Sequence, residues 1–236
     1  MTAIPITDFE LDLQLRSKFE ECMDHYGVGD ATSSQWPNNI LSNQLVVYSS
    51  GVIARQGDKI RHNVDPNELA LCNRLSQEAC QIMDGVAVRM GSESEDFFHP
   101  FFIVANLDEH VREAITPELI REKFGGTIFI HAKILVQSLS EPEEFWSEFL
   151  ADYNDDDLEE MKAEIEKWEL LIQKLNENPE IQTTAFVKIG DYSLMDLSED
   201  EFPDGTEMPG CVYPRLVLGL TQKGSLVGLL GQIVQT

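Results

Sequence analysis

The C-terminal end of the chain constrains the fold more than any other segment. Two apolar runs rich in β-forming residues, 213–221 and 225–234, are separated only by a turn at Gln222-Lys223-Gly224. Such runs around a short glycine-containing turn are typical of a β-hairpin. We therefore expect this hairpin to lie at the centre of a sheet, with a helix covering one face of that sheet.

Four helices are expected before the hairpin. Thr7 begins a capping-box pattern, and apolar residues then recur at helical intervals as far as Tyr26. Asp65 and Thr116 each precede a proline, which is typical of a helix start. Apolar residues at alternating three- and four-residue steps predict the longest helix, over 155–178.

The remaining predicted elements are β-strands. The run that contains Pro100 is expected to be an edge strand or to be broken there, because proline lacks a backbone N–H. The strands are predicted at 44–48, 51–55, 86–90, 97–104, 127–136 and 183–189.

Composition limits the class of protein and its partners. The 236 residues, 42% of them hydrophobic, suit one large α/β domain or a compact domain with an extension. With 17 Lys and Arg against 42 Asp and Glu, the net charge of -25 repels nucleic acid and anionic membranes and attracts basic surfaces. The sequence shows no secretory leader and no apolar run of the roughly 20 residues that a spanning helix needs. We therefore expect a cytoplasmic protein whose four cysteines are reduced thiols.

Three further patterns carry a family resemblance. The hairpin has the form G-x-T-x-x-G-x-L-x-G over 219–228 and runs on to a terminal Thr236. Upstream, Asp84-Gly85 precedes a strand and then Ser92-Glu93-Ser94-Glu95, and the long helix ends in Asn178-Pro179. Over roughly residues 70–236 this order of features resembles the nuclease A inhibitor family.

The resemblance implies both a fold and a function. The fold is α+β, a three-layer α/β/α sandwich over residues 70–236, and residues 1–69 are expected to form an N-terminal α/β extension. The implied function is inhibition of a basic, sugar-nonspecific, metal-dependent nuclease whose active site the inhibitor plugs. The chain itself would then be no enzyme, and its partner would be a protein rather than a nucleic acid or a membrane.

The same resemblance implies the partner-binding residues. Inhibitors of this type insert a glutamate of the Ser-Glu-Ser-Glu turn and the C-terminal threonine near the catalytic Mg²⁺ of the nuclease. By resemblance these residues are Glu93 and Thr236, with Glu95 as an alternative in register and Gln235 beside the terminus, where the family has an acid. A carboxylate can replace phosphate oxygens near a hard cation. No catalytic residue, metal ligand or cofactor is expected, because the metal belongs to the target.

Three other interpretations remain open from the residues alone. Glu93 and Glu95 have the composition of an ordinary solvated turn, and Thr236 that of a frayed end. A metal-dependent hydrolase using His99, His110 or His131 is a second interpretation, although none of these lies in a known ligand or catalytic pattern. The third is an acidic adaptor or DNA mimic that binds another basic partner.

Overall fold

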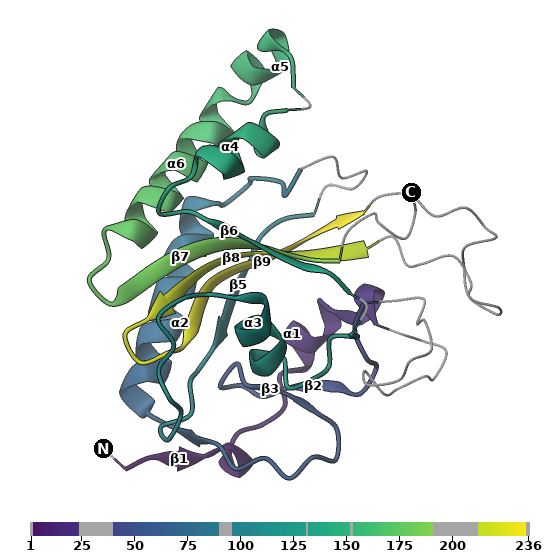
Figure 1. The fold of residues 1–236 in the computed structure, drawn as a ribbon, viewed down its shortest axis with the longest axis vertical. Coiled ribbons are helices and arrows are strands. Elements are labelled where there is room, and N and C mark those ends of the chain that lie inside the picture. Colours follow the sequence, from purple (N-terminus) through teal and green to yellow (C-terminus); the bar gives the residue numbers. More distant parts are fainter. Residues whose placement is uncertain are drawn as a thin grey trace, which may run out of the picture.

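The computed structural model describes residues 2–23, 40–89, 96–130, 132–151, 153–190 and 212–234. These residues form a mixed α+β fold built around a five-stranded antiparallel sheet (Figure 1). The sheet contains β5 (His99–Ile103), β6 (Ile134–Ser138), β7 (Ile181–Ile189), β8 (Val212–Thr221) and β9 (Leu226–Val234). The helices are α1 (Leu13–Ser17), α2 (Pro66–Ile82), α3 (Pro117–Lys123), α4 (Glu143–Phe149), α5 (Asp155–Glu160) and α6 (Lys162–Asn176).

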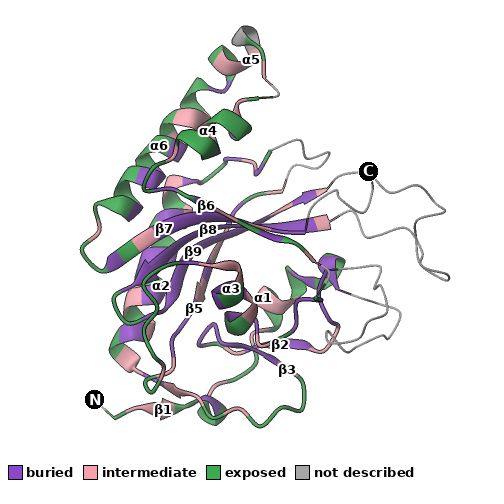
Figure 2. Cartoon of the chain, in the orientation of Figure 1, coloured by how far each residue is buried: buried purple, intermediate pink, exposed green. Residues whose placement is uncertain are grey.

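The C-terminal hairpin occupies the middle of this sheet, as predicted. The strand order is β5-β9-β8-β7-β6, so β8 is central and β9 lies beside it. Both strands are buried along nearly their whole length (Figure 2). This burial explains the continuous apolar runs in the sequence, because a strand covered on both faces has no solvent side for polar residues.

Helices cover one face of the sheet. Asp65 caps α2 through a bond from the Asn67 N–H, and α2 packs against β5 and β9. On the same face, Trp168 of α6 makes edge contacts with Phe98 and Phe186, with ring centroids 5.3 and 6.4 Å apart. The predicted N-cap of α2 and the predicted helical cover are therefore confirmed.

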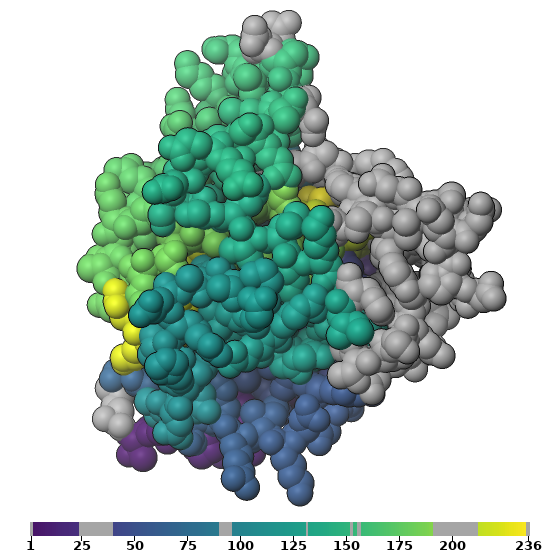
Figure 3. All heavy atoms as spheres, in the orientation of Figure 1, coloured from purple at the N-terminus to yellow at the C-terminus, as the bar shows by residue number. Residues whose placement is uncertain are grey.

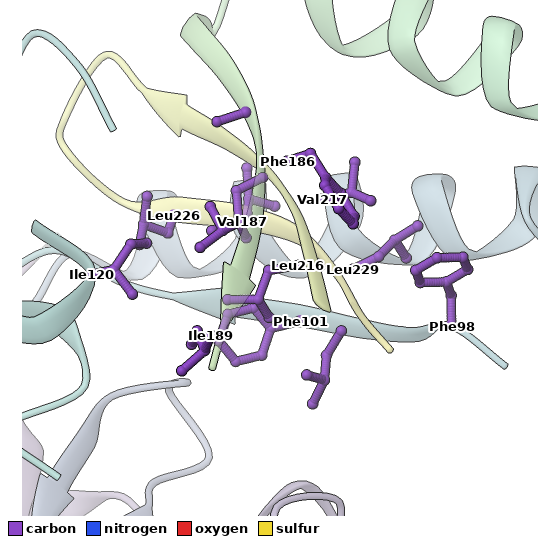
Figure 4. Close-up of a cluster of buried hydrophobic side chains, with 14 of the residues drawn as sticks. Phe98, Phe101, Ile120, Phe186, Val187, Ile189, Leu216, Val217, Leu226 and Leu229 are labelled. Carbon is purple, nitrogen blue, oxygen red and sulfur yellow. The ribbon is translucent and has the colours of Figure 1, made fainter. Parts of the chain in front are cut away.

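The opposite face is covered by the N-terminal segment and α3. Phe101 of β5 lies 6.3 Å from the rings of both Phe19 and Phe124. Figure 4 shows the two sides of the strands, with Phe186 and Val217 on one and Phe101 on the other. A single hydrophobic core includes residues of 1–69 and of 70–236, and the N-terminal segment lies directly against the rest of the molecule (Figure 3).

The N-terminal segment differs from the predicted helix over residues 7–26. It contains the short turns η1 (Ile6–Asp8) and η2 (Glu20–Cys22) on either side of α1. Residues around Asp12 are extended because they pair with other backbone: the Asp12 N–H donates to Val47 and the Ser49 N–H to Glu10. Two small sheets complete the segment, formed by β1 (Ile4–Pro5) with β4 (Asn63–Val64) and by β2 (Leu45–Val47) with β3 (Ile53–Arg55).

Other predicted boundaries also change. Of the strand predicted over 127–136, only the part from Ile134 onward is a strand among the described residues. Before it, the Arg121 guanidinium binds backbone carbonyls at Phe129, Ile130 and Ala132 that a ladder would use. The long helix is interrupted at Met161, and α4 was not predicted. The described part of the predicted strand 86–90, residues 86–89, forms an isolated bridge, Ala87 with Phe97, and no strand.

The outer edge of β5 is closed to further pairing. Pro100 lacks an N–H, which agrees with the predicted edge position. The carbonyl oxygen of Phe102 faces Gly51 so closely that a Cβ there would lie 2.1 Å from it, and the Cys80 thiol reaches the Phe98 carbonyl at 3.6 Å. This edge also borders a groove of about 590 Å³ between α1 and α2, so it is recessed rather than open.

No described helix is long and apolar enough to cross a bilayer. Cys72 and Cys80 are free thiols, Cys22 is buried, and Cys211 lies outside the described residues.

Candidate partner-binding site

The four predicted partner-binding residues lie outside the described part of the chain. Glu93 and Glu95 belong to the undescribed stretch 90–95, and Gln235 and Thr236 follow the last described residue, Val234. The described residues do show how both stretches are attached to the fold. The candidate site is therefore defined by the described residues to which these two stretches are attached.

The acidic turn is attached to a narrow pair of extended segments. The Val88 N–H donates to the Asp96 carbonyl at 2.8 Å, and Ala87 bridges antiparallel to Phe97. We call residues 84–89 and 96–98 the hairpin base. Val88 and Phe98 are buried, whereas Phe97 is 45% exposed.

The hairpin base lies against the last strand of the chain. The Gln232 N–H of β9 donates to the Asp96 carboxylate at 3.1 Å. One residue earlier, Gly231 leaves no room for a side chain, since a Cβ there would lie 2.4 Å from Val88 and 3.0 Å from Phe98. The two chain segments that lead to the predicted site residues are therefore in direct contact at one end of the sheet.

Helix α6 holds the other side of the hairpin base. Arg89 makes a two-pronged ion pair with Glu164, with Nε and Nη2 donating to the carboxylate at 2.7 and 2.9 Å. Lys167 donates to the Asp84 carbonyl. Arg89 is also the only non-glycine residue among those described that has a positive φ, at 50°. This conformation is unfavourable for a residue with a Cβ and needs support from its surroundings.

The N-terminal segment supports β9 from the opposite face. The Gln232 side-chain amide donates to the Lys18 carbonyl and lies 3.6 Å from the Cys22 sulfur. Neither Gln232 nor Arg89 was predicted as a site residue. A polar residue inside an otherwise apolar strand was the one sequence signal for Gln232, and Arg89 had none.

Among the described residues, no histidine of the rival hydrolase interpretation belongs to a candidate metal centre. His99 lies 4.0 Å from Asp96, His110 is exposed, and His131 lies outside the described residues. In the described part of the chain, no three His, Cys, Asp or Glu side chains are grouped so that they could hold a metal ion.

A histidine that sequence reasoning missed is half-buried beside a small cavity. His62 lines a cavity of about 320 Å³ together with Lys123 and Glu109, which form an ion pair at 2.6 Å. Its Nε2 atom is buried and has no hydrogen-bond partner among the described residues. Burial, and then the charge of Lys123, lower the pKa of His62 below its ordinary value of 6.5, against smaller opposing effects of Glu109 and backbone hydrogen bonds.

We expect His62 to make the fold less stable in mild acid. A lowered pKa in the folded state means that the unfolded chain binds the proton more tightly, so the stabilisation is complete above about pH 6.5 and is lost as the pH falls below it. The free energy of unfolding, measured by urea denaturation between pH 7 and 5.5, should therefore decrease. His62→Gln should reduce this slope.

His99 contributes in the same direction, because burial and Lys18 also lower its pKa. The double variant His62→Gln with His99→Gln should therefore have the flattest profile. An unchanged slope in both His62→Gln and the double variant would contradict the prediction.

Neither a protein-family model nor a curated protein sequence matches this chain.

Proposed function

We propose that this chain is a proteinaceous inhibitor of a basic, sugar-nonspecific, metal-dependent nuclease, and that it plugs the nuclease active site with its acidic turn and its C-terminal threonine. Residues Glu93 and Thr236 would enter the site, with Glu95 and Gln235 beside them. The proposal includes the α/β/α sandwich over residues 70–236 and the extension over 1–69.

One observation supports this proposal most directly. The hairpin base and the end of β9 are in contact through the bond from Gln232 to Asp96 and through the packing of Val88 on Gly231. A plug made of two chain segments requires that both reach the same cleft, and segments that begin side by side satisfy this requirement. The C-terminal segment begins at the end of a buried strand, and the acidic turn begins at the hairpin base that packs against this strand. Such anchoring lowers the ordering cost of binding.

The charge of the chain favours the same kind of partner. An excess of 25 negative charges attracts the basic surface with which a nuclease binds its substrate. The carboxylate of Glu93 and the terminal carboxylate of Thr236 would take the place of phosphate oxygens around the metal of the nuclease, which prefers oxygen ligands. The inhibitor needs no metal or cofactor of its own in this mechanism.

Titration of the chain into a nuclease assay tests the proposal. Against a panel of basic, sugar-nonspecific, metal-dependent nucleases we expect stoichiometric loss of DNA cleavage for at least one of them. Association should slow as salt rises from about 50 to 500 mM, because attraction between opposite charges is screened. The electrostatic part would be contradicted by association rates that are independent of salt, and the function by full activity of every nuclease at a tenfold excess of the chain.

A second candidate function is an acidic adaptor or DNA mimic. Helices α4, α5 and α6 extend beyond the sheet (Figure 1), and their exposed acids are numerous: Glu143, Glu144, Glu159, Glu160, Glu166 and Glu169. A row of carboxylates on a helical surface can imitate a phosphate backbone for a DNA-binding protein. Competition between the chain and duplex DNA for a non-enzymatic DNA-binding protein, with no inhibition of the nuclease panel, would favour this function.

A further inference from the structure

The hairpin base is held by one face of helix α6. Glu164 binds Arg89, Lys167 binds the Asp84 carbonyl, and Trp168 packs edge-on against Phe98. These three helix positions are three and four residues apart, so they share one helical face. The helix therefore contacts both segments of the hairpin base, at Asp84 and Arg89 of the first and at Phe98 of the second.

We infer that Arg89 and Glu164 are positioning residues: their ion pair fixes the backbone at residue 89 relative to α6, and so the point from which the acidic stretch 90–95 continues toward the partner. The inference rests on the proposed function, which it deepens by naming the contact that orients the plug. Arg89 and Glu164 themselves need not touch the nuclease.

The geometry of Arg89 supports a role in setting the direction of the backbone at this residue. Its φ of 50° turns the chain at the point where the acidic stretch begins. A two-pronged guanidinium–carboxylate pair fixes an angle as well as a distance, because the planar fork fits the carboxylate in one orientation. Without the pair, the orientation of residue 89 relative to α6 loses the two hydrogen bonds that fix it.

The exposure of the pair argues against a mainly stabilising role. The Arg89 and Glu164 side chains are 42% and 25% exposed, and ion pairs of this kind contribute little to global stability. The buried contacts around it, Trp168 with Phe98 and Val88 on Gly231, keep Val88 and Phe98 in place without the pair, which leaves residue 89 as the position that the pair orients. The ion pair therefore contributes mainly to the orientation of residue 89, and little to the free energy of folding.

Two single variants separate positioning from charge. Arg89→Gln makes the chain one unit more negative, and Glu164→Gln makes it one unit less negative. If only attraction to a basic nuclease mattered, these variants would change the inhibition constant in opposite directions. Positioning predicts that both weaken inhibition, each by about tenfold.

Charge exchange provides the rescue. The double variant Arg89→Glu with Glu164→Arg should bring the inhibition constant back to within about threefold of the original chain, because the pair is restored with its partners reversed. Arg74→Gln is the matched control, since it breaks the exposed ion pair of Arg74 with Glu78 on α2, which is remote in sequence and on another helix. It should leave inhibition unchanged, and all variants should keep the same thermal midpoint.

Residual dipolar couplings of amides at Val88, Arg89 and in α6 test the inference without any nuclease. In Arg89→Gln and Glu164→Gln the orientation of the amide at residue 89 relative to Val88 and α6 should change, and in the charge-exchange variant it should return. Unchanged couplings in both single variants would overturn positioning, whatever the nuclease assay shows. So would inhibition constants that move in opposite directions. Failure of the original chain to inhibit any nuclease, with the couplings changing as expected, would instead reject the proposed function alone.

Discussion

Deletion of Thr236 is expected to weaken nuclease inhibition by roughly 30-fold to several-thousand-fold. Loss of a buried, charge-assisted contact typically costs about 2 to 5 kcal/mol in binding, which corresponds to that range. The threonine would bring a hydroxyl and a carboxylate to the metal site of the nuclease, and its removal would leave the groups there facing water. Inhibition constants of the original and shortened chains, measured under the same salt conditions, give the comparison.

The fold should be unaffected by this deletion, because the last described strand ends at Val234 and its buried residues lie upstream. The thermal midpoint is therefore the control. Appending a few residues after Thr236 should be as harmful as the deletion, whereas Glu93→Gln should cause a smaller loss, since it keeps the shape of the side chain. A C-terminally extended chain that inhibits as well as the original would rule out the plug mechanism.

Substitution of Gly228 by alanine should lower the free energy of unfolding by about 3 kcal/mol or more. Gly228 lies in β9 between β8 and β5, and a Cβ at this position would lie 1.9 Å from the carbonyl oxygen of Val217. Neither backbone can move away without breaking ladder hydrogen bonds of the central strands. Urea denaturation followed by circular dichroism and tryptophan fluorescence measures the loss.

Two other glycines provide a graded comparison. Gly219→Ala should be milder than Gly228→Ala, because its Cβ would meet the end of the flexible Ile181 side chain at 2.8 Å. Gly57→Ala has a positive φ of 88° but open space around it, so it should cost only about 1 to 2 kcal/mol of backbone strain. Equal losses in the three variants would show that the contact with Val217 is not the cause.

The elements predicted correctly are those whose signals are local. The final hairpin, the start of α2 at Asp65 and the edge position of the strand containing Pro100 all follow from turn, cap and proline chemistry within a few residues. The predicted helix over 7–26 and the strand over 127–136 failed for the opposite reason. Val47 pairs with the backbone at Asp12, and Arg121 takes carbonyls that a strand would need. Both contacts come from tertiary structure and leave no periodic trace in the sequence.

The hairpin motif that carries part of the resemblance has a structural explanation at several of its positions. The Thr221 hydroxyl donates to buried Glu68 at 2.6 Å and accepts from the Ser225 N–H. Gly219 leaves space for the Ile181 side chain, and Gly228 leaves space for the Val217 carbonyl. The motif therefore accounts for the shape of the hairpin. The functional part of the resemblance depends on the Ser-Glu-Ser-Glu stretch and Thr236.

The contacts of the candidate site could not be predicted from the sequence. Arg89 and Glu164 are separated by 75 positions, and Asp96 and Gln232 by 136. No spacing rule connects residues so far apart, and each pair combines ordinary surface residue types. Only the three-dimensional fold shows that the acidic stretch starts beside the end of the final strand.

The closed edge at β5 limits how copies of this chain can self-associate. Sheets aggregate by adding strands to unpaired edges, and an aggregate grows without limit only if each copy offers two such edges. Pro100, Gly51 and the flanking helices remove one of them, which leaves β6 as the other edge of the described sheet. Pairing through β6 would therefore end at two molecules, which would also repel each other through their excess of acidic residues. A fibril built on the described sheet would have no second open edge on which to add strands.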